Sequence, residues 1–398
     1  MRILYLADVR FPLERANGIQ TFETCHALAS RGHEVTLAVR PDTARPMRDP
    51  FAFYGQPALS SFRIVRAPVP SASLQRAAYL AFAAQLALRT RPDVVFTRDL
   101  GVAAALVRLP RPARPPLVYE SHGFAPVVSR TLPQLVAGAP APSTAKIARL
   151  ERRERRVWEH ADGYVTITGA LASELAERYG SRDRLTIAAD GVRLHGDRQY
   201  TPKPFGRPPI VAYAGHLYPW KGVDVLVDAL ARLDGVRGLI VGGHPSERDA
   251  ARVAHRVAAC ALGHRVTMIG MVPPGEVAAH LAGADVLALP NTATAISDRY
   301  TSPLKLFEYM AAGRPIVVSD LAAIREVVRH RESAWLVPPG DADALAEGIR
   351  QVLGDELLAH SLAARAWADA AEYSWARRAE RLEALLLEVR QPAGGARR

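Results

Sequence analysis

The stretch SPLKLFEYMAAGRPIVVSD, residues 302–320, places a lysine and a glutamate three positions apart at the head of an apolar segment. Ser302 is a good helix cap and Pro303 is tolerated in a first helical turn, while Gly313 is typical of a helix end. We therefore expect a helix between them, followed by a buried strand over 316–318. Lys305 and Glu308 then share one helix face behind the free amides of Leu304 and Lys305. Such amides beside a lysine form a site for an anion, most often a phosphate.

Glu308, one turn deeper in this helix, suits the paired hydroxyls of a sugar such as ribose. The alternative for an isolated Lys–Glu pair is solvated surface. The chain contains 47 arginines but only four lysines, so arginine is its default cation. A retained lysine is then informative, because an ammonium and a guanidinium do not substitute freely. This reasoning selects Lys221 and Lys305.

The elements that must position these residues alternate along the chain. Strand-like runs and helical stretches follow one another almost throughout, which predicts parallel sheets flanked by helices. We predict a domain over 1–198, a proline-rich linker over 199–209, a second domain over 210–373 and an amphipathic helix over 374–390 that packs back on the first domain. Residues 42–75 and 124–145 have no clean period and read as loops or short helices. In doubly wound sheets the ligand crevice lies at the carboxyl ends of the strands.

Five ordered segments of the second half follow such strand ends. They are HLYPWKGVDVLVDAL, GMVPPGEV, ADVLALP, the stretch 302–320 and AWLVPPGDADALAEGI. With ANGIQTFETCHALASRGHEVTLAV near the N-terminus, their order and spacing resemble the retaining glycosyltransferases of the GT-B fold, in particular glycosyltransferase family 4. The resemblance covers nearly the whole chain and is weakest at 42–75 and 124–145. It implies an α/β protein of two Rossmann-like, doubly wound parallel-sheet domains that face a deep cleft.

The resemblance also implies roles in the first domain. Gly18, in a loop after the first strand, would let the backbone approach the pyrophosphate of a nucleotide-sugar donor. The alternative is a plain turn glycine. His122, at the end of a buried strand, would lie near the sugar and the reaction centre. The alternative is an ordinary loop histidine.

In the second domain the resemblance implies a complete donor site. Lys221 and Lys305 would be catalytic together with His122, because they would neutralise the leaving diphosphate. Glu308 would hold the ribose hydroxyls, and Val272 would meet the base through its backbone. The remaining donor-binding positions are Gly215, His216, Ser302 and Leu304. The alternatives are a surface lysine at 221 and a buried apolar residue at 272.

The sequence departs from the family pattern at the sugar. The family's arginine partner of the lysine is replaced by His216, and its glutamate eight residues before Glu308 is replaced by Tyr300. Asp298 is close in sequence to the position of the missing glutamate but not at it. Pro303 has no backbone N–H, so it removes one amide donor that relatives would present there. Lys305 would then compensate for the missing arginine. These substitutions leave the identity of the sugar open.

The predicted function is the retaining transfer of a sugar from a nucleotide-diphosphate sugar to an acceptor, with front-face attack by the acceptor. Two alternatives are a nucleotide-sugar 2-epimerase and a catalytically silent nucleotide-sugar-binding subunit. Asp341 and Asp343 match the metal-binding D-x-D pattern of another glycosyltransferase fold, but they open a helix, so capping explains them better. We expect no metal and no other cofactor.

Charge and cysteine content indicate the setting. Residues 1–200 contain 28 Lys and Arg against 18 Asp and Glu, whereas the remainder contains 23 against 22. This basic half predicts an anionic partner, such as a lipid-linked or polymeric acceptor or an anionic membrane surface. No nucleic-acid motif is present. Cys25 and Cys260 lie far apart in the sequence, which fits a reduced cytoplasm. With the basic half, this predicts a cytoplasmic protein that contacts the inner face of the membrane peripherally.

Overall fold

The computed structural model describes residues 1–43, 46–68, 74–135, 138–194, 199–243 and 248–391. The chain forms two compact units, one of residues 1–130, 142–190 and 375 onward, and one of residues 131–141 and 191–374. The units divide between Asp190 and Gly191 and again between Ser374 and Trp375. The predicted end of the first domain, residue 198, lies outside the described residues.

Unit 1 contains a seven-stranded parallel sheet in the order β3-β2-β1-β4-β5-β6-β7. Its strands are β1 (Arg2–Phe11), β2 (Glu34–Pro41), β3 (Phe62–Arg66), β4 (Val94–Thr97), β5 (Leu117–Ser121), β6 (Gly163–Thr166) and β7 (Leu185–Ile187). The central strands β4, β5 and β6 are buried along their whole length. Continuous burial is expected where helices cover both faces of a parallel sheet.

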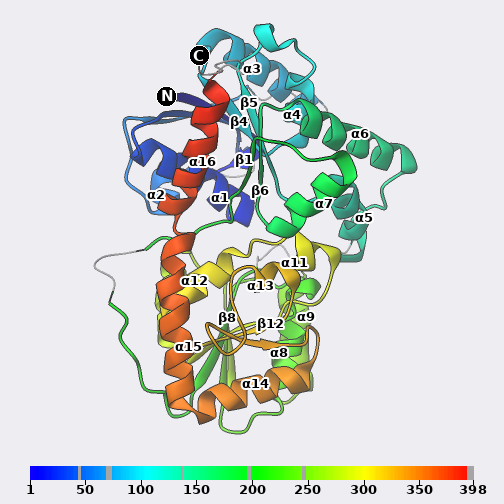
Figure 1. The fold of residues 1–398 in the computed structure, drawn as a ribbon. Coiled ribbons are helices and arrows are strands. Elements are labelled where there is room, and N and C mark those ends of the chain that lie inside the picture. The colour runs from blue at the N-terminus through cyan, green and yellow to red at the C-terminus, as the bar shows by residue number, and fades with distance from the viewer. Residues whose placement is uncertain (44–45, 69–73, 136–137, 195–198, 244–247, 392–398) are drawn as a thin grey trace. The chain divides into compact units, whose positions relative to one another are not determined.

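The helices of unit 1 are α1 (Ala16–Ser30), α2 (Pro50–Tyr54), α3 (Gln75–Thr90), α4 (Leu100–Leu106), α5 (Ala125–Leu135), α6 (Thr144–His160), α7 (Gly169–Tyr179) and α16 (Trp375–Arg390); α5 ends in unit 2. The last helix of the chain, α16, lies beside α1 (Figure 1, red and blue). Its apolar face, which includes Leu382, Leu385 and Val389, joins the core of unit 1. Residues more than 350 positions apart in sequence therefore pack against each other.

Two local predictions for unit 1 are wrong. Residues 62–66, read as loop or short helix, form the edge strand β3, whose arginines are exposed and hide its apolar pattern. Gly18 lies inside α1 and not in a loop. A Cβ at Gly18 would overlap the carbonyl oxygen of Leu13 and crowd the hydroxyl of Tyr54. The close approach that Gly18 permits in this structure is therefore to its own unit.

Unit 2 contains a six-stranded parallel sheet in the order β10-β9-β8-β11-β12-β13. Its strands are β8 (Ile210–Ala214), β9 (Arg237–Val241), β10 (Val266–Gly270), β11 (Val286–Leu289), β12 (Ile316–Ser319) and β13 (Trp335–Val337). The order reverses between β8 and β11, as it does between β1 and β4 in unit 1. The predicted fold class of two doubly wound parallel sheets is confirmed.

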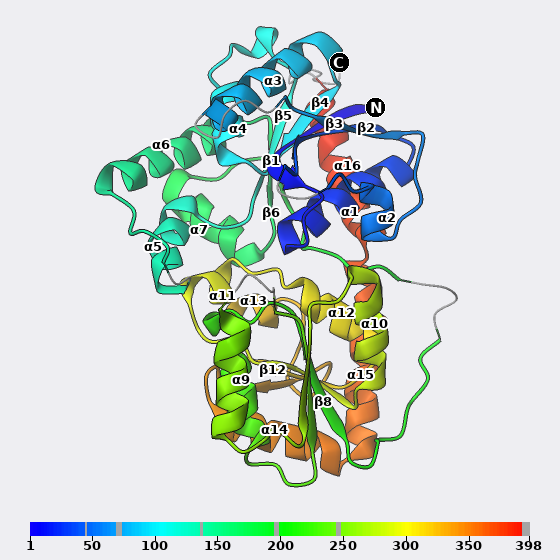
Figure 2. The ribbon, with the colours of Figure 1, turned by 180° about the vertical axis from the view of Figure 1, so that it is seen from behind.

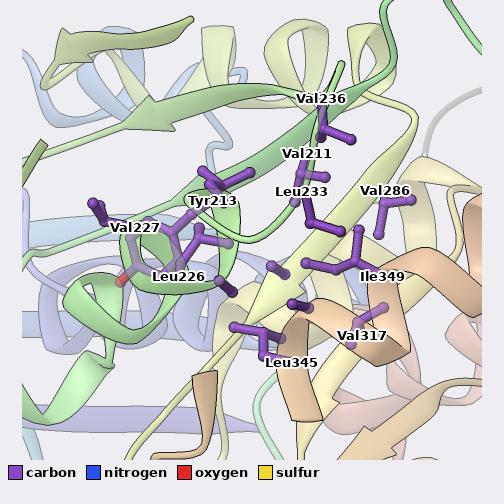
Figure 3. Close-up of a cluster of buried hydrophobic side chains, with 14 of the residues drawn as sticks. Val211, Tyr213, Leu226, Val227, Leu233, Val236, Val286, Val317, Leu345 and Ile349 are labelled. Atoms are coloured by element: carbon purple, nitrogen blue, oxygen red, sulfur yellow. The ribbon is translucent and has the colours of Figure 1, made fainter. Parts of the chain in front are cut away.

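Helices cover both faces of the second sheet (Figures 1 and 2). On one face lie α8 (Val223–Leu230), α9 (Asp249–Ala259) and α14 (Ala342–Gly354). On the other lie α10 (Pro274–Gly283), α12 (Leu304–Ala312) and α15 (Glu356–Asp369). The short helices α11 (Ala295–Arg299) and α13 (Ala322–Arg325) complete the unit. Figure 3 shows the first face, where Val211, Leu226 and Ile349 meet in the core.

The stretch 302–320 folds nearly as predicted. Gly313 ends α12 in the left-handed region, with φ of 64°, and the strand that follows is buried. The predicted cap is wrong, because Pro303 and not Ser302 occupies the N-cap position, and no side chain caps the helix. Pro303 has an extended backbone, so the first helical residue is Leu304.

Candidate functional site

The carboxyl ends of β8 and β9 meet the lysine of α12 in unit 2. Gly215 directly follows β8 and has φ of 144°. A Cβ at Gly215 would overlap the side chain of Lys305, and a Cβ at Gly242, after β9, would overlap the carbonyl of Gly215. Both glycines are thus required for three chain segments to pack. The structure brings Gly215 and Lys305, both predicted donor-binding positions, into direct contact.

Lys221 and Lys305 interact electrostatically in this unit. Burial lowers the pKa of Lys221 well below its ordinary value, and the charge of Lys305 lowers it further. Burial also lowers the pKa of Lys305, which Glu308 opposes. Two ammonium groups thus share a poorly hydrated region with one carboxylate. An anion bound there would stabilise both charges.

Glu308 lies one turn along α12 from Lys305. Burial raises its pKa, while Lys305 and Arg193 oppose that rise. Arg193 lies just after the division between the units, in a segment for which no motif signals a site. The sequence therefore identified the lysine–glutamate pair but missed the arginine.

A ladder of three rings holds the loop that follows β8. His216 stacks on Tyr218 with ring centroids 5.1 Å apart and planes 7° apart, and Tyr218 stacks on Trp220 with planes 9° apart. The ammonium of Lys221 lies 3.6 Å from the centroid of the Trp220 ring. A cation over an aromatic face is stabilised by the ring. Lys221 is half-buried, with the Trp220 ring under its ammonium.

The ring ladder has a sequence signal that could have been found. The rings come from alternate residues of HLYPWK, and the last of them, Trp220, lies in the short 3-10 helix Pro219–Lys221. The segment between β11 and α11 then holds the ladder's end, because the amide of Thr292 donates to the carbonyl of Trp220 at 3.1 Å. The adjacent polar residue Asn291 is 1% exposed, and the sequence analysis did not select it as a site residue.

The other predicted positions of unit 2 lie at strand ends. Val272 is half-buried in the loop between β10 and α10, behind Gly270 with φ of 82°. Leu304 opens α12. Tyr300, where the family has a glutamate, is 3% exposed. Asp298 accepts a hydrogen bond from the amide of Ala322 at 3.0 Å, so it already caps α13.

The remaining predicted positions, His122 and Gly18, belong to unit 1. His122 directly follows β5, and its Nε2 lies 2.6 Å from Oε1 of Glu120. The role of Glu120 as the partner of His122 was not predicted from the sequence. Glu120 is wholly buried, so it is not placed as a nucleophile. Gln20, in the same helix as Gly18, also donates to Glu120, at 2.7 Å.

The D-x-D sequence is a helix cap. Asp341 accepts a hydrogen bond from the amide of Ala344 at 2.9 Å, at the start of α14. Asp343 is exposed and pairs with Arg232 at 2.5 Å. No group of three or more His, Cys, Asp or Glu side chains in the described ranges is arranged to hold a metal ion. Among the same residues, no helix combines the length and apolar character of a membrane span.

Comparison with known proteins agrees with this architecture. Residues 18–195 match the sequence model described as Glycosyltransferase Family 4, and residues 208–355 match that of Glycosyl transferases group 1. The chain belongs to glycosyltransferase family 4. The two matches meet in the segment that separates the two sheets.

Curated relatives of this family 4 member include two actinobacterial enzymes. The D-inositol 3-phosphate glycosyltransferase of Nocardia farcinica is 31% identical over 286 residues, or 68% of this chain and 60% of the relative. The GDP-mannose-dependent alpha-(1-6)-phosphatidylinositol monomannoside mannosyltransferase of Mycobacterium tuberculosis is 30% identical over 56% of this chain and 60% of the relative. The matches thus span about 60% of the length of these relatives.

Solved structures show the same fold over almost the entire chain. Sucrose-phosphate synthase of Thermosynechococcus elongatus superposes with a TM-score of 0.76, 22% identity and 98% coverage of both chains. Anabaena HepE, solved in complex with UDP-glucose, gives 0.73 at 18% identity, covering 98% of this chain and 100% of its own. These likenesses show the GT-B fold.

Proposed function

We propose that the protein transfers a sugar, with retention of anomeric configuration, from a nucleotide-diphosphate sugar held by unit 2 to an acceptor. The observation that carries the proposal is the cluster of Lys221, Lys305 and Glu308 at the carboxyl ends of the second sheet. Burial lowers the pKa of both lysines, and the charge of Lys305 lowers that of Lys221 further. Glu308 is an acidic neighbour of Lys305, and a bound diphosphate would add negative charge beside both ammonium groups.

In this proposal the lysines act on the leaving group. Charge that develops on the diphosphate as the glycosidic bond breaks is stabilised by Lys221 and Lys305 and by the amides at the start of α12. Glu308 holds the ribose hydroxyls, and the loop containing Val272 holds the base. The complexes of HepE with UDP-glucose and the GDP-mannose dependence of the mycobacterial relative support a nucleotide-sugar donor.

Retention follows in this proposal from front-face attack. Glu120 is the carboxylate nearest to His122, and it is buried and already hydrogen-bonded. We therefore assign no covalent intermediate to it. The acceptor hydroxyl attacks from the side that the diphosphate leaves, and the leaving phosphate oxygen takes the hydroxyl's proton. No metal takes part in this proposal.

We further propose an anionic acceptor at the surface of a membrane. One face of α6, the α6 basic face, carries five cations without an acidic partner among the described residues: Lys146, Arg149, Arg152, Arg153 and Arg156. Burial and the charge of Arg149 lower the pKa of Arg153, so these cations repel each other. The phosphorylated or phosphatidylinositol-based acceptors named for the two curated relatives support this proposal.

Two other charged residues of unit 1 are engaged inside the unit. Arg76 is paired with both Asp8 and Asp99, so its charge is neutralised within the unit. Glu154, on the same helix as the α6 basic face, is wholly buried and accepts a hydrogen bond from the amide of Ala125. It therefore does not balance the cations of that face.

A thermal-shift screen against nucleoside diphosphates, followed by turnover assays with a panel of donors and acceptors, tests the proposal. A ligand at 100 times its Kd stabilises the protein by about 2.7 kcal/mol. Binding together with sugar transfer supports the proposal. Binding without turnover indicates a silent subunit, and change at C2 without an acceptor indicates a 2-epimerase.

A further inference from the structure

His122 is held by a buried carboxylate that three side chains share. Oε1 of Glu120 lies 2.6 Å from Nε2 of His122, 2.7 Å from Nε2 of Gln20 and 2.6 Å from Nη2 of Arg378. Glu120 and Arg378 are 0% and 2% exposed, whereas the His122 side chain is 20% exposed. Of these four side chains only the imidazole therefore reaches the surface of the unit to an appreciable degree.

The hydrogen bonds fix the tautomer of His122. An ionised carboxylate only accepts, so Nε2 of His122 must carry the proton that lies between them. Burial opposes ionisation of Glu120, but the charges of Arg378 and of His122 outweigh it and lower its pKa to about 2. Burial, aided by Arg98, lowers the pKa of His122 to about 4, against the pull of Glu120. At neutral pH Nδ1 is thus an unprotonated acceptor.

Arg378 ties this network to the last helix of the chain. From α16 it donates to the carbonyl of Ala189 at 2.9 Å and to Oγ1 of Thr24 at 3.2 Å, besides its bond to Glu120. It also contacts the carbonyl of Ala188. On the other side, Arg98 donates to Oε1 of Gln20 at 2.6 Å. The orientation of the Glu120 carboxylate is therefore determined from α1, the end of β4 and α16 together.

We propose that Glu120 is a positioning residue for His122: held in place by Arg378, it keeps the proton on Nε2 and leaves Nδ1 as the hydrogen-bond acceptor for a hydroxyl group of a bound sugar. The inference rests on the proposed sugar transfer. A neutral imidazole carries no charge, so His122 does not stabilise the anionic diphosphate electrostatically as a cation would. A catalytic or ligand-binding contact by Glu120 itself is excluded by its burial.

The alternative is that Glu120 and Arg378 only hold α16 against the sheet. Breaking a buried pair by removing one partner destabilises a protein strongly, so loss of activity alone does not separate the two roles. The tautomer of His122 does separate them, because a purely structural pair has no effect on it. A variant must therefore keep the charge of Glu120 and change only its reach.

The experiment compares Glu120→Asp with Glu383→Asp in protein labelled with ¹⁵N-histidine. Glu383, also a partner of a histidine in unit 1, lies 2.7 Å from Nε2 of His33 and is the matched control. Aspartate keeps the negative charge but withdraws it from the ring. The His122 signals are identified by their loss in His122→Gln, and kcat and KM for the donor are measured on each variant.

We expect wild-type His122 to be protonated at Nε2 alone and Glu120→Asp to populate both tautomers. Its kcat should fall about 10- to 100-fold, since small misplacements have effects of that size, while KM for the donor changes less than about threefold. Glu383→Asp should alter neither the His122 signals nor kcat. Where Glu120→Asp fails to fold, Gln20→Met takes its place, because it removes one donor to the carboxylate and leaves the Glu120–Arg378 pair intact. It should shift the tautomer and kcat in the same direction.

A proton on Nδ1 in the wild type, or an unchanged tautomer with unchanged kcat in Glu120→Asp, overturns the inference. The tautomer is measured without substrate. If no donor is turned over, the proposed function fails even where the tautomer is as expected, and the hydroxyl contact falls with it. The two failures are thus distinguishable.

Discussion

At the scale of residues, the donor site depends on two lysines that the protein does not neutralise on its own. Lys305 has Glu308 nearby, whereas the electrostatic neighbour of Lys221 is another cation. The Trp220 ring partly offsets this by lying under the ammonium. Such an arrangement stabilises an incoming anion and disfavours the empty state.

Lys221→Ala tests this directly. Removing one donor of positive charge to the leaving group should lower kcat/KM by about two to three orders of magnitude. The melting temperature should stay equal or rise, because the variant removes a partly buried cation that Lys305 repels. Lys203→Ala is the matched control, since the ammonium of Lys203 donates to the carbonyls of Ala282 and Gly283. Kinetics like those of the wild type would remove Lys221 from the mechanism.

Glu308→Gln should act on binding and less on chemistry. The neutral amide is a weaker acceptor for the ribose hydroxyls, and Lys305 loses the charge that supports it. We expect the Kd for the nucleoside diphosphate, measured by calorimetry, to rise about tenfold. The exposed Glu347→Gln variant, which affects only Arg350 and Gln351, should bind like the wild type. An unchanged Kd would return Glu308 to the surface-pair interpretation.

At the scale of elements, α6 has two faces of opposite character. Outward it presents the α6 basic face, and inward it presents Glu154 to the amide of Ala125 and the hydroxyl of Tyr164. Burial raises the pKa of Glu154 to about 7 despite these two hydrogen bonds. Glu154 therefore keeps its proton to a higher pH than an exposed glutamate does, because burial opposes its ionisation.

The stability of unit 1 should accordingly fall with rising pH through this group. Glu154 ionises near pH 4.5 in the unfolded chain, but burial raises its pKa to about 7 in the folded chain. The stability that the protonated group allows is therefore fully present below pH 4.5 and is lost as the pH rises through about 7. Glu154→Gln should raise the melting temperature at pH 8 and change it little at pH 4.5; the gain corresponds to at most about 3 kcal/mol. The exposed Glu151→Gln variant is the control. An equal change at both pH values would contradict the assignment.

Local signals explain which elements the sequence could predict. Gly313 and Pro315 mark the end of α12, and the apolar run behind them is the buried strand β12. The edge strand β3 was missed because its arginines break the apolar pattern. The start of α1 was missed because Gly18 is typical of a turn. The alternation of elements predicted parallel sheets flanked by helices, but it did not give the order of the strands.

Sequence motifs single out Gly215, directly after β8, and Lys305, in the first turn of α12, and the structure brings these two residues together. The site was not predictable where partners meet across the chain. Glu120 and Arg378 are 258 residues apart, and no local pattern in either segment signals the other. Buried polar partners of this kind are chosen by three-dimensional geometry, which periodicity along the sequence does not encode.

At the scale of the whole molecule, we expect Lys221, Lys305 and the helix amides to stabilise the leaving diphosphate without a metal ion. Asp341 serves as a cap, and the described residues contain no metal-binding group. Transfer measured in excess EDTA should therefore equal transfer in Mg²⁺ or Mn²⁺ within about twofold. Activity that EDTA removes and Mg²⁺ or Mn²⁺ restores, at an unchanged melting temperature, would show that the lysines do not carry the leaving-group charge alone.

The excess positive charge lies in the N-terminal half of the chain, whereas the proposed donor site lies in unit 2. Residues 1–200 carry an excess of ten positive charges and the remainder an excess of one, yet the proposed donor site lies in unit 2. The donor therefore does not account for the α6 basic face, whereas an acceptor on an anionic membrane would. Each basic residue near such a surface contributes about 1 kcal/mol, and salt screens it over a Debye length of about 10 Å at 0.1 M.

The protein should therefore sediment with vesicles that contain anionic lipid, more at low salt than at high salt, and not with neutral vesicles. Replacing Arg149, Arg152 and Arg156 by glutamine should reduce the bound fraction severalfold. Replacing Arg350, Arg365 and Arg377, which are paired with acids, removes the same charge and should leave binding unchanged. Equal losses in both triple variants would assign the binding to net charge alone. Equal partitioning onto neutral and anionic vesicles, or none at any salt, would mean that the acceptor is diffusible and that the α6 basic face is solvated surface.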